Sequence, residues 1–188
     1  MIKDNKMWLG ASIHSGDREF MIPPTYEVRS KSLRVDEKGN RYIRVVGVRW
    51  FTNLDYSQRH EDLDLFKKYS PEEYPTYDNY DAINVNSTSD IPCDYEGAMG
   101  VPITFLDKYS PDQFEILTLG IGESNFTPTK KYGKFRNSET GEYCSDKRDY
   151  LLYIRDKNGK YLTEEGYRVT KLYARIIIRN KKPQKTWK

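Results

Sequence analysis

The sequence predicts a β-rich α+β domain, in which a mixed or antiparallel sheet is joined by loops and short helices. β-branched and aromatic residues gather in short runs such as Arg41–Thr52 and Lys171–Arg179, which is typical of strands. The chain also holds 16 tyrosines. Tyrosine packs its ring while its hydroxyl stays in contact with water, so it suits a half-exposed sheet. The 188 residues are enough for a single domain.

Turn-forming residues divide these runs into strands. Asp36–Asn40 is expected to be the turn of a hairpin between Tyr26–Val35 and Arg41–Thr52, and Asn158-Gly159 favours a second tight hairpin. Further strands are expected at Val101–Leu106, Phe114–Leu119 and Tyr150–Arg155.

The last expected strand, Lys171–Arg179, has one apolar face. Alternation places four apolar side chains there: Leu172, Ala174, Ile176 and Ile178. The other face carries Tyr173, Arg175, Ile177 and Arg179. Two arginines beside an isoleucine predict a half-exposed face rather than a second core.

Helices are expected to be few and short. Ser70–Glu73 and Ser110–Gln113 each begin with serine and proline and place an acidic or amide residue three positions after the serine, a helix-capping pattern. Apolar spacing favours a longer helix within Tyr56–Tyr69. The segment 122–148 has no period and is expected to be an irregular loop, either functional or mobile.

Charge is unevenly distributed along the chain. The net charge is +3, but residues 55–115 hold four basic and 14 acidic residues, whereas residues 168–188 hold eight basic and no acidic residues. Residues 130–136 interleave four basic residues with two aromatic ones. Basic groups neutralise phosphates and rings stack on bases, so both basic segments are candidate polyanion contacts. A solvated loop and tail remain the alternative.

The sequence offers little for a metal site or a membrane span. Two cysteines, Cys93 and Cys144, and two histidines, His14 and His60, make a His/Cys metal site improbable. No apolar stretch approaches the roughly 20 residues of a membrane helix, and the first residues form no signal-peptide core. We therefore expect a cytoplasmic protein that binds neither a metal nor a membrane.

Several segments, in this order and spacing, resemble the C-terminal half of EcoRI-type adenine-specific DNA methyltransferases. The three main ones are Val48–Asp55, Tyr77–Ile83 and Ile91–Tyr109, of which the last continues through Pro111 and Gln113 to Ile116. Lys6–Gly10 and Tyr173–Arg179 fit the same family.

The resemblance implies a restriction-modification enzyme that transfers a methyl group from S-adenosylmethionine to adenine N6 in double-stranded DNA. In that family the cofactor and catalytic motifs lie upstream of the region around Trp8. The chain is therefore expected to be a truncated product, a fragment or one half of a split enzyme, with a separate N-terminal catalytic half as a possible partner. Within one domain, residues 1–55 are then expected to complete the methyltransferase sheet. Residues 56–188 form the target-recognition region, with a basic tail at 180–188.

Two motifs within the chain imitate those of the missing half. Such enzymes place Asp or Asn before Pro-Pro and an aromatic residue after it, and the aromatic residue stacks on the extruded base. The segment Ile22-Pro23-Pro24-Thr25 has neither group. Gly120-Ile121-Gly122 resembles a cofactor-binding turn, but a loop-like segment follows it instead of a helix. No catalytic, cofactor-binding or metal-binding residue is assigned, and S-adenosylmethionine is implied only for the complete enzyme.

Basic, amide and aromatic side chains are the candidates for DNA contact, because arginine and asparagine pair with base edges and lysine with phosphates. They are Arg49, Trp50, Asn53, Arg59, Asn79, Lys130, Lys131, Tyr132, Lys134, Arg136, Arg175, Arg179, Lys181 and Lys182. Two other functions stay open: a non-enzymatic DNA-binding module, and a tyrosine-rich β-domain that binds carbohydrate or protein.

Overall fold

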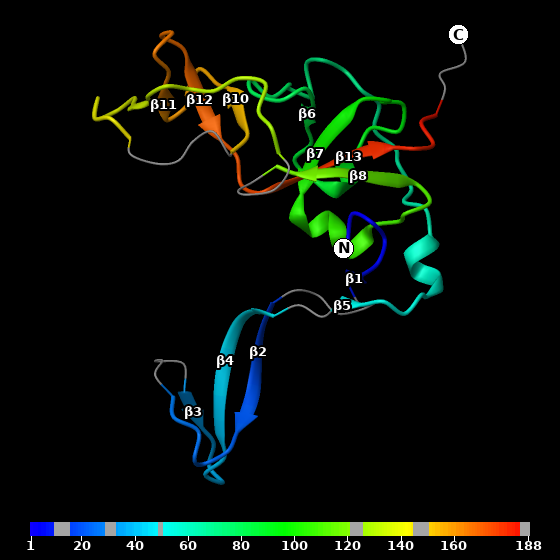
Figure 1. Cartoon of the computed structure of the whole chain (residues 1–188), viewed down its shortest axis with the longest axis vertical. Helices are drawn as coiled ribbons and strands as arrows, with labels where there is room; N and C mark the ends of the chain where they lie inside the picture. The colour runs from blue at the N-terminus through cyan, green and yellow to red at the C-terminus, as the bar shows by residue number, and fades with distance from the viewer. Residues whose placement is uncertain (10–15, 29–32, 49–50, 121–125, 145–150, 185–188) are drawn as a thin grey trace.

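A computed structural model describes residues 1–9, 16–28, 33–48, 51–120, 126–144 and 151–184. Figure 1 shows a four-stranded sheet, the central sheet. Side chains of this sheet contribute to the largest apolar core cluster of the described residues. The strands of the sheet, in spatial order, are β6 (Ile83–Asn84), β7 (Ala98–Pro102), β13 (Arg175–Asn180) and β8 (Phe114–Leu119). β6 runs parallel to β7 and the other pairs are antiparallel, which confirms the predicted mixed, β-rich fold.

The middle strand β13 is buried on both faces at Ile176, Ile177 and Ile178. Ile176 and Ile178 pack with Phe105 and Met99 in one core cluster, as the alternation predicts. Ile177 points the other way and packs with Tyr77 in a second cluster. On this second face Arg175 is half-buried and Arg179 is exposed, as predicted, but Ile177 is buried in a second core, which the sequence did not predict.

The expected strand Lys171–Arg179 is divided between two sheets. Its first part belongs to β12 (Arg168–Lys171), and its last part is β13. β12 lies in the lobe, a second four-stranded sheet with the order β10-β12-β11-β9. The other strands of the lobe are β9 (Arg136–Asn137), β10 (Tyr153–Arg155) and β11 (Tyr161–Leu162).

The lobe corrects two expectations. Asn158-Gly159 lies in a turn, but the flanking strands β10 and β11 do not pair, because β12 lies between them. The segment 122–148, expected to be irregular, contributes β9 and three buried rings, Phe126, Tyr132 and Phe135. Tyr132 and Phe135 pack with Tyr153 and Val169 as the core of the lobe.

Residues 16–28 and 33–48 contain an antiparallel sheet of their own, the arm. It contains β2 (Gly16–Ile22), β3 (Leu33–Val35) and β4 (Arg41–Val48) in the order β2-β4-β3. The predicted hairpin turn at Asp36–Asn40 is confirmed: Asp36 Oδ1 accepts from the backbone N–H groups of Lys38 and Asn40, and Gly39 adopts a φ of 82°. The arm extends away from the central sheet along the long axis of the molecule (Figure 1).

A short ladder lies at the base of the arm. It pairs β1 (Trp8–Leu9) with β5 (Phe51–Thr52). Residues 49–50 lie outside the described part of the chain, so the predicted strand Arg41–Thr52 is represented by β4 and β5.

The helices in the described part of the chain are short 3-10 helices. They are η1 (Ser57–His60), η2 (Thr88–Asp90) and η3 (Ile103–Lys108). Two predictions were wrong here: the expected helix in Tyr56–Tyr69 is only η1, and the expected strand Val101–Leu106 is the end of β7 followed by η3. Phe114–Leu119 is confirmed as β8.

The two serine-proline patterns form turns rather than helices. At the first, the N–H groups of Glu73 and Tyr74 donate to the Ser70 carbonyl. At the second, Gln113 does not return to Ser110 but bonds the backbone of Leu63 through both amide atoms. No helix in the described residues is long and apolar enough to cross a membrane.

Candidate nucleic-acid interface

Strand register places two arginines on the open side of the lobe. Leu162 pairs with Arg168 on β12 and with Arg136 on β9, so these three side chains share one face. Arg136 and Arg168 are exposed. The opposite face carries the buried side chains of Tyr153 and Val169. At Arg136, Leu162 and Arg168 the sheet therefore has an open, basic side, whereas the rings of the lobe core pack on its opposite side.

Tyr143 lies on the open side beside Arg136. A β-bridge joins the two residues, the guanidinium carbon of Arg136 lies 4.6 Å from the ring centroid, and Nη2 donates to the Tyr143 hydroxyl at 2.7 Å. Lys134 Nζ lies 5.5 Å from the same centroid. We call Lys134, Arg136, Tyr143, Leu162 and Arg168 the basic face.

The cations of the basic face are not neutralised by ion pairs within the described residues. Lys134, Arg136, Tyr143 and Leu162 line a shallow groove of about 360 Å³, to which Glu164 also contributes. Exposed cations around an exposed ring suit a nucleic-acid backbone with accessible bases.

A buried carboxylate anchors the lobe behind this face. The side chain of Asp78 is 4% exposed and accepts from Tyr132 Oη at 2.6 Å, Tyr167 Oη at 2.7 Å and Arg155 Nε at 2.6 Å. Burial alone would raise the pKa of Asp78, but these three hydrogen bonds outweigh it and hold that pKa below its usual range. Burial and the nearby carboxylate raise the pKa of Tyr132. Lys130 continues the network to Tyr167 and Glu165.

Three of the candidate DNA contacts are buried and make contacts within the protein. Asn79 donates to the Leu151 carbonyl at 2.6 Å and accepts from the Tyr153 N–H at 3.0 Å. Tyr132 belongs to the lobe core and the Asp78 network. The guanidinium of Arg59 lies 3.7 Å from the Trp8 ring centroid and contacts Asp55. Each of these three residues is at most 8% exposed.

The other candidates are spread over the molecule. Asn53, Lys131, Lys134, Arg136 and Arg179 are exposed, whereas Lys130 and Arg175 are half-buried. Arg175 donates to Asn84 Oδ1 and Arg179 pairs with Glu115. Arg49 and Trp50 lie outside the described residues. Of the whole set, the structure brings Lys134 and Arg136 together with Tyr143 on one surface.

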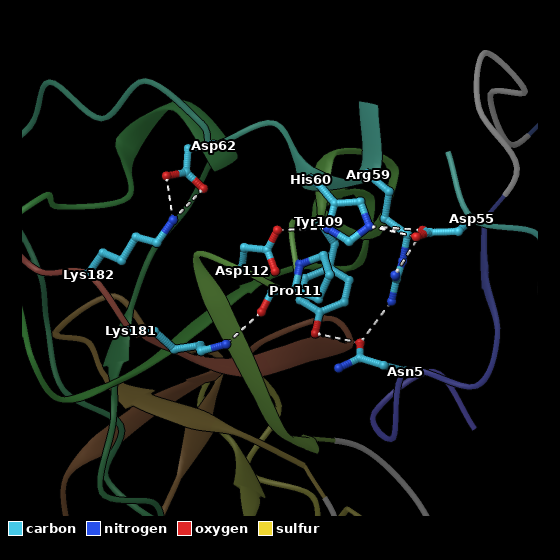
Figure 2. Close-up of polar contacts among 10 residues, drawn as sticks. All are labelled: Asn5, Asp55, Arg59, His60, Asp62, Tyr109, Pro111, Asp112, Lys181 and Lys182. Atoms are coloured by element: carbon cyan, nitrogen blue, oxygen red, sulfur yellow. Dashed lines mark hydrogen bonds and ion pairs between the residues drawn. The ribbon is translucent and has the colours of Figure 1, made fainter. Parts of the chain in front are cut away.

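The basic end of the chain is held against the acidic middle segment (Figure 2). Lys182 Nζ contacts both carboxylate oxygens of Asp62, at 2.8 and 3.2 Å, and Lys181 Nζ donates to the Pro111 carbonyl at 2.7 Å. The backbone of Lys181 also donates to Gln113. Up to residue 184, therefore, the expected free basic tail is packed on the protein and partly neutralised.

His60 bridges two carboxylates in the same region (Figure 2). Its Nδ1 lies 2.7 Å from Asp112 Oδ2 and its Nε2 lies 2.9 Å from Asp55 Oδ1. Hydrogen bonding to Asp55 and Asp112 raises the pKa of His60. This arrangement joins η1 to the turn before β8.

The two motif-like segments each begin at the end of an antiparallel strand. Pro23 and Pro24 lie in a turn after β2, where Arg41 binds both carbonyls. Gly120 ends β8, an edge strand antiparallel to its neighbour, and donates to the Arg175 carbonyl. A cofactor turn instead follows a parallel strand and opens a helix. Residues 121–125 lie outside the described part.

Metal-binding clusters of His, Cys, Asp or Glu are absent from the described residues, where Cys93 and Cys144 are free thiols. Sequence reasoning missed Tyr143, Arg168 and the anchoring Asp78. Tyr143 lies seven residues after Arg136 and is joined to it by a β-bridge. No periodic pattern in the sequence predicts this bridge. Cross-strand register alone brings Arg168 to the same face.

Comparison of this chain with known proteins places it in a family. The family model described as adenine-specific methyltransferase EcoRI matches residues 1–181. The type II methyltransferase M.EcoRI of Escherichia coli is 49% identical over 140 residues, which cover 72% of this chain and 43% of that protein. M.MgeORF184P of Mycoplasma genitalium is 30% identical over 181 residues, covering 94% and 50%. M.MpnI of Mycoplasma pneumoniae is 33% identical over 149 residues, covering 73% and 46%.

The chain spans about half the length of these relatives. No solved structure matches it. The match over residues 1–181, together with these relatives, shows that the chain belongs to the EcoRI-type family of adenine-specific DNA methyltransferases.

Proposed function

We propose that this chain supplies DNA contacts to an adenine-specific methyltransferase of a bacterial restriction-modification system, acting in the cytoplasm. The observation that carries the proposal is the basic face, in which Lys134 and Arg136 lie beside the exposed ring of Tyr143 and Arg168 lies on the same side of the sheet. The relatives are named type II methyltransferases, and we infer double-stranded DNA as the polyanion that this surface contacts. A surface with several cations and no ion pairs among the described residues gives salt-sensitive affinity for that polyanion.

Methyl transfer from S-adenosylmethionine to adenine N6 is assigned to a separate catalytic portion. Two observations support this division. The Pro-Pro segment is a turn of the arm without an aromatic neighbour, and Gly120 ends an antiparallel edge strand, so the described residues do not fit the cofactor or the target base. The relatives also carry about as much chain again as the part that matches this protein.

The division of labour within the chain follows from its sheets. We assign the recognition role to residues 56–188, which contain the central sheet and the lobe, and the junction with the catalytic portion to residues 1–55. In support, β2, β3 and β4 leave several large apolar side chains exposed, among them Phe20, Leu33, Val35 and Val45. Exposed apolar sheet surface of this kind suits a protein neighbour better than water.

Fluorescence anisotropy with a labelled duplex of about 20 base pairs tests the proposal. The 188-residue chain should bind, and log Kd should depend linearly on log salt concentration. A Lys134→Ala/Arg136→Ala variant should bind more weakly. The slope of log Kd against log salt concentration should fall by roughly 2, since each lost phosphate contact removes about 0.9. The matched control is Lys67→Ala/Lys68→Ala, two exposed lysines in the acidic segment, which should bind like the wild type.

Labelled S-adenosylmethionine supplies the second measurement. The chain alone should transfer no methyl group to DNA, and turnover without a partner would overturn the assignment of chemistry to a separate portion. Absence of DNA binding at low salt, or equal loss in both double variants, would overturn the DNA-contact assignment. Binding that is strong but independent of salt would overturn the role of the basic face.

A further inference from the structure

Tyr143 is held in a fixed orientation while much of its ring stays in contact with solvent. The side chain is 58% exposed, although Arg136 Nη2 binds its hydroxyl at 2.7 Å. Ordering an exposed tyrosine side chain usually does not stabilise a protein, because holding the side chain in one rotamer costs conformational entropy. Here the ring lies close to two cations, with Lys134 Nζ 5.5 Å and the guanidinium carbon of Arg136 4.6 Å from its centroid.

The backbone beneath the ring is also fixed. Residues 137–142 form a tight turn, in which the Asn137 N–H donates to the Glu142 carbonyl and Gly141 takes a φ of 70°. The Cys144 N–H donates to the carbonyl of Phe135, whose ring is buried in the lobe core. Tyr143 is therefore presented by a short hairpin that is tied to the core on both sides.

We propose that Tyr143 is a stacking platform for an unpaired base of the bound DNA, with Lys134 and Arg136 contacting the phosphates on either side. This inference rests on the proposed function and specifies the DNA conformation that the basic face prefers. In an intact duplex, base faces are covered by their neighbours, so a protruding ring reaches one only where a base is extruded or a step is opened. An aromatic ring flanked by cations is the arrangement that binds unpaired nucleotides without regard to sequence.

The groove beside the ring fits this ligand. It has a volume of about 360 Å³, and Leu162, Thr163 and Gly166 contribute to its walls. These small and apolar groups accept the edge of a planar base. Glu164, at the rim, disfavours a phosphate at its own position and so directs the backbone toward Lys134 and Arg136.

The test compares three labelled DNAs of equal length with the 188-residue chain: an intact duplex, the same duplex with one unpaired base, and a single strand. The variants are Tyr143→Phe, which keeps the ring and removes the hydroxyl, and Tyr143→Ala. The matched control is Tyr173→Ala, since Tyr173 is 91% exposed and lies outside the basic face. A 2-aminopurine at the unpaired position reports stacking directly through its fluorescence.

The wild type should bind the unpaired-base duplex more tightly than the intact one. Tyr143→Ala should weaken that binding about tenfold, the effect of losing one base–aromatic stack, and should leave the intact duplex within about twofold. Tyr143→Phe and Tyr173→Ala should behave like the wild type, and 2-aminopurine fluorescence should be quenched by all except Tyr143→Ala.

The outcomes separate the two proposals. If intact duplex binds but Tyr143→Ala leaves the preference and the quenching unchanged, the stacking inference is overturned and the proposed function stands. If none of the three DNAs binds, both are overturned. Circular dichroism of Tyr143→Ala, an exposed substitution, identifies any loss caused by unfolding, and the Tyr143→Phe variant then still decides: a loss of quenching in that folded protein would overturn the inference.

Discussion

The Nε atom of Arg155 donates a hydrogen bond of 2.6 Å to Oδ1 of Asp78 across 77 positions of sequence. The preceding residue, Tyr77, forms a β-bridge with Ile154 of β10. The backbone N–H of Asp78 donates to the Tyr153 carbonyl. One carboxylate thus joins the lobe to the segment that leads into the central sheet. Its remaining oxygen is taken by the hydroxyls of Tyr132 and Tyr167.

Asp78→Asn should lower the free energy of unfolding by about 2 kcal/mol. The substitution keeps the size of the side chain but removes the charge that three donors share, and hydrogen bonds to a charged, buried group are the strong ones. The value lies below that of a fully buried ion pair because Arg155 is 65% exposed. Urea unfolding measures it, with Asp64→Asn, an exposed carboxylate, as the control. Equal stability of Asp78→Asn and the wild type would contradict the anchoring role.

Acid should remove the difference between the wild type and Asp78→Asn. The pKa of Asp78 is lowered in the folded protein, so its ionisation stabilises the fold at any pH above the unfolded value of about 3.9. That contribution is lost as the pH falls through the folded pKa. The two unfolding free energies should therefore converge below pH 4, and a constant difference from pH 7 to pH 3 would show that the Asp78 charge is not the cause.

The sequence predicted local features better than long-range ones. The strand Phe114–Leu119 and the turn at Asp36–Asn40 follow from neighbouring residues, and both are confirmed. Asn79 and Arg59 were predicted as DNA contacts from their residue types. Asn79 instead bonds the backbone of Leu151 and Tyr153, 72 and 74 positions away. Arg59 contacts Trp8 and Asn5, about 50 positions away. Lys134 and Arg136 were identified because they are neighbours, whereas Tyr143 and Arg168 join them only through strand register.

His60 should titrate with a raised pKa that depends on Asp112. A neutral imidazole donates through one nitrogen only, whereas His60 has a carboxylate on each, so the charged form is favoured. The stabilisation is complete below the unfolded pKa of about 6.5 and is lost as the pH rises through the folded value. The advantage of the wild type over His60→Gln should thus be largest near pH 5 and vanish in mild alkali. NMR titration should give a lower pKa in Asp112→Asn, and an unchanged value would contradict the bridge.

Gly100→Ala should destabilise the protein by about 2 kcal/mol, or roughly 4–8 °C in Tm. A Cβ atom at Gly100 would lie 2.0 Å from the Tyr77 hydroxyl oxygen and 2.7 Å from the ring, and this tyrosine is buried. The Tyr77 hydroxyl also donates to Asn84, so moving it breaks a buried hydrogen bond. Differential scanning fluorimetry measures the shift. Gly133→Ala is the matched control, because its Cβ meets only the carboxylate end of the exposed Glu164. Similar shifts in the two variants would contradict the packing argument.

Lys182→Ala should leave DNA binding unchanged, although this lysine belongs to the most basic part of the sequence. Its ammonium is already paired with both oxygens of Asp62, and a cation that is neutralised within the protein releases no counterion from DNA. Lys134→Ala should instead reduce the salt slope by about 0.9, because no carboxylate among the described residues pairs with Lys134. Asp62→Ala frees Lys182 and should slightly strengthen binding. Anisotropy titrations between 50 and 200 mM salt, the range over which phosphate contacts change affinity most visibly, compare the three variants. A slope reduced in Lys182→Ala and unchanged in Lys134→Ala would move the DNA contact from the basic face to the end of the chain.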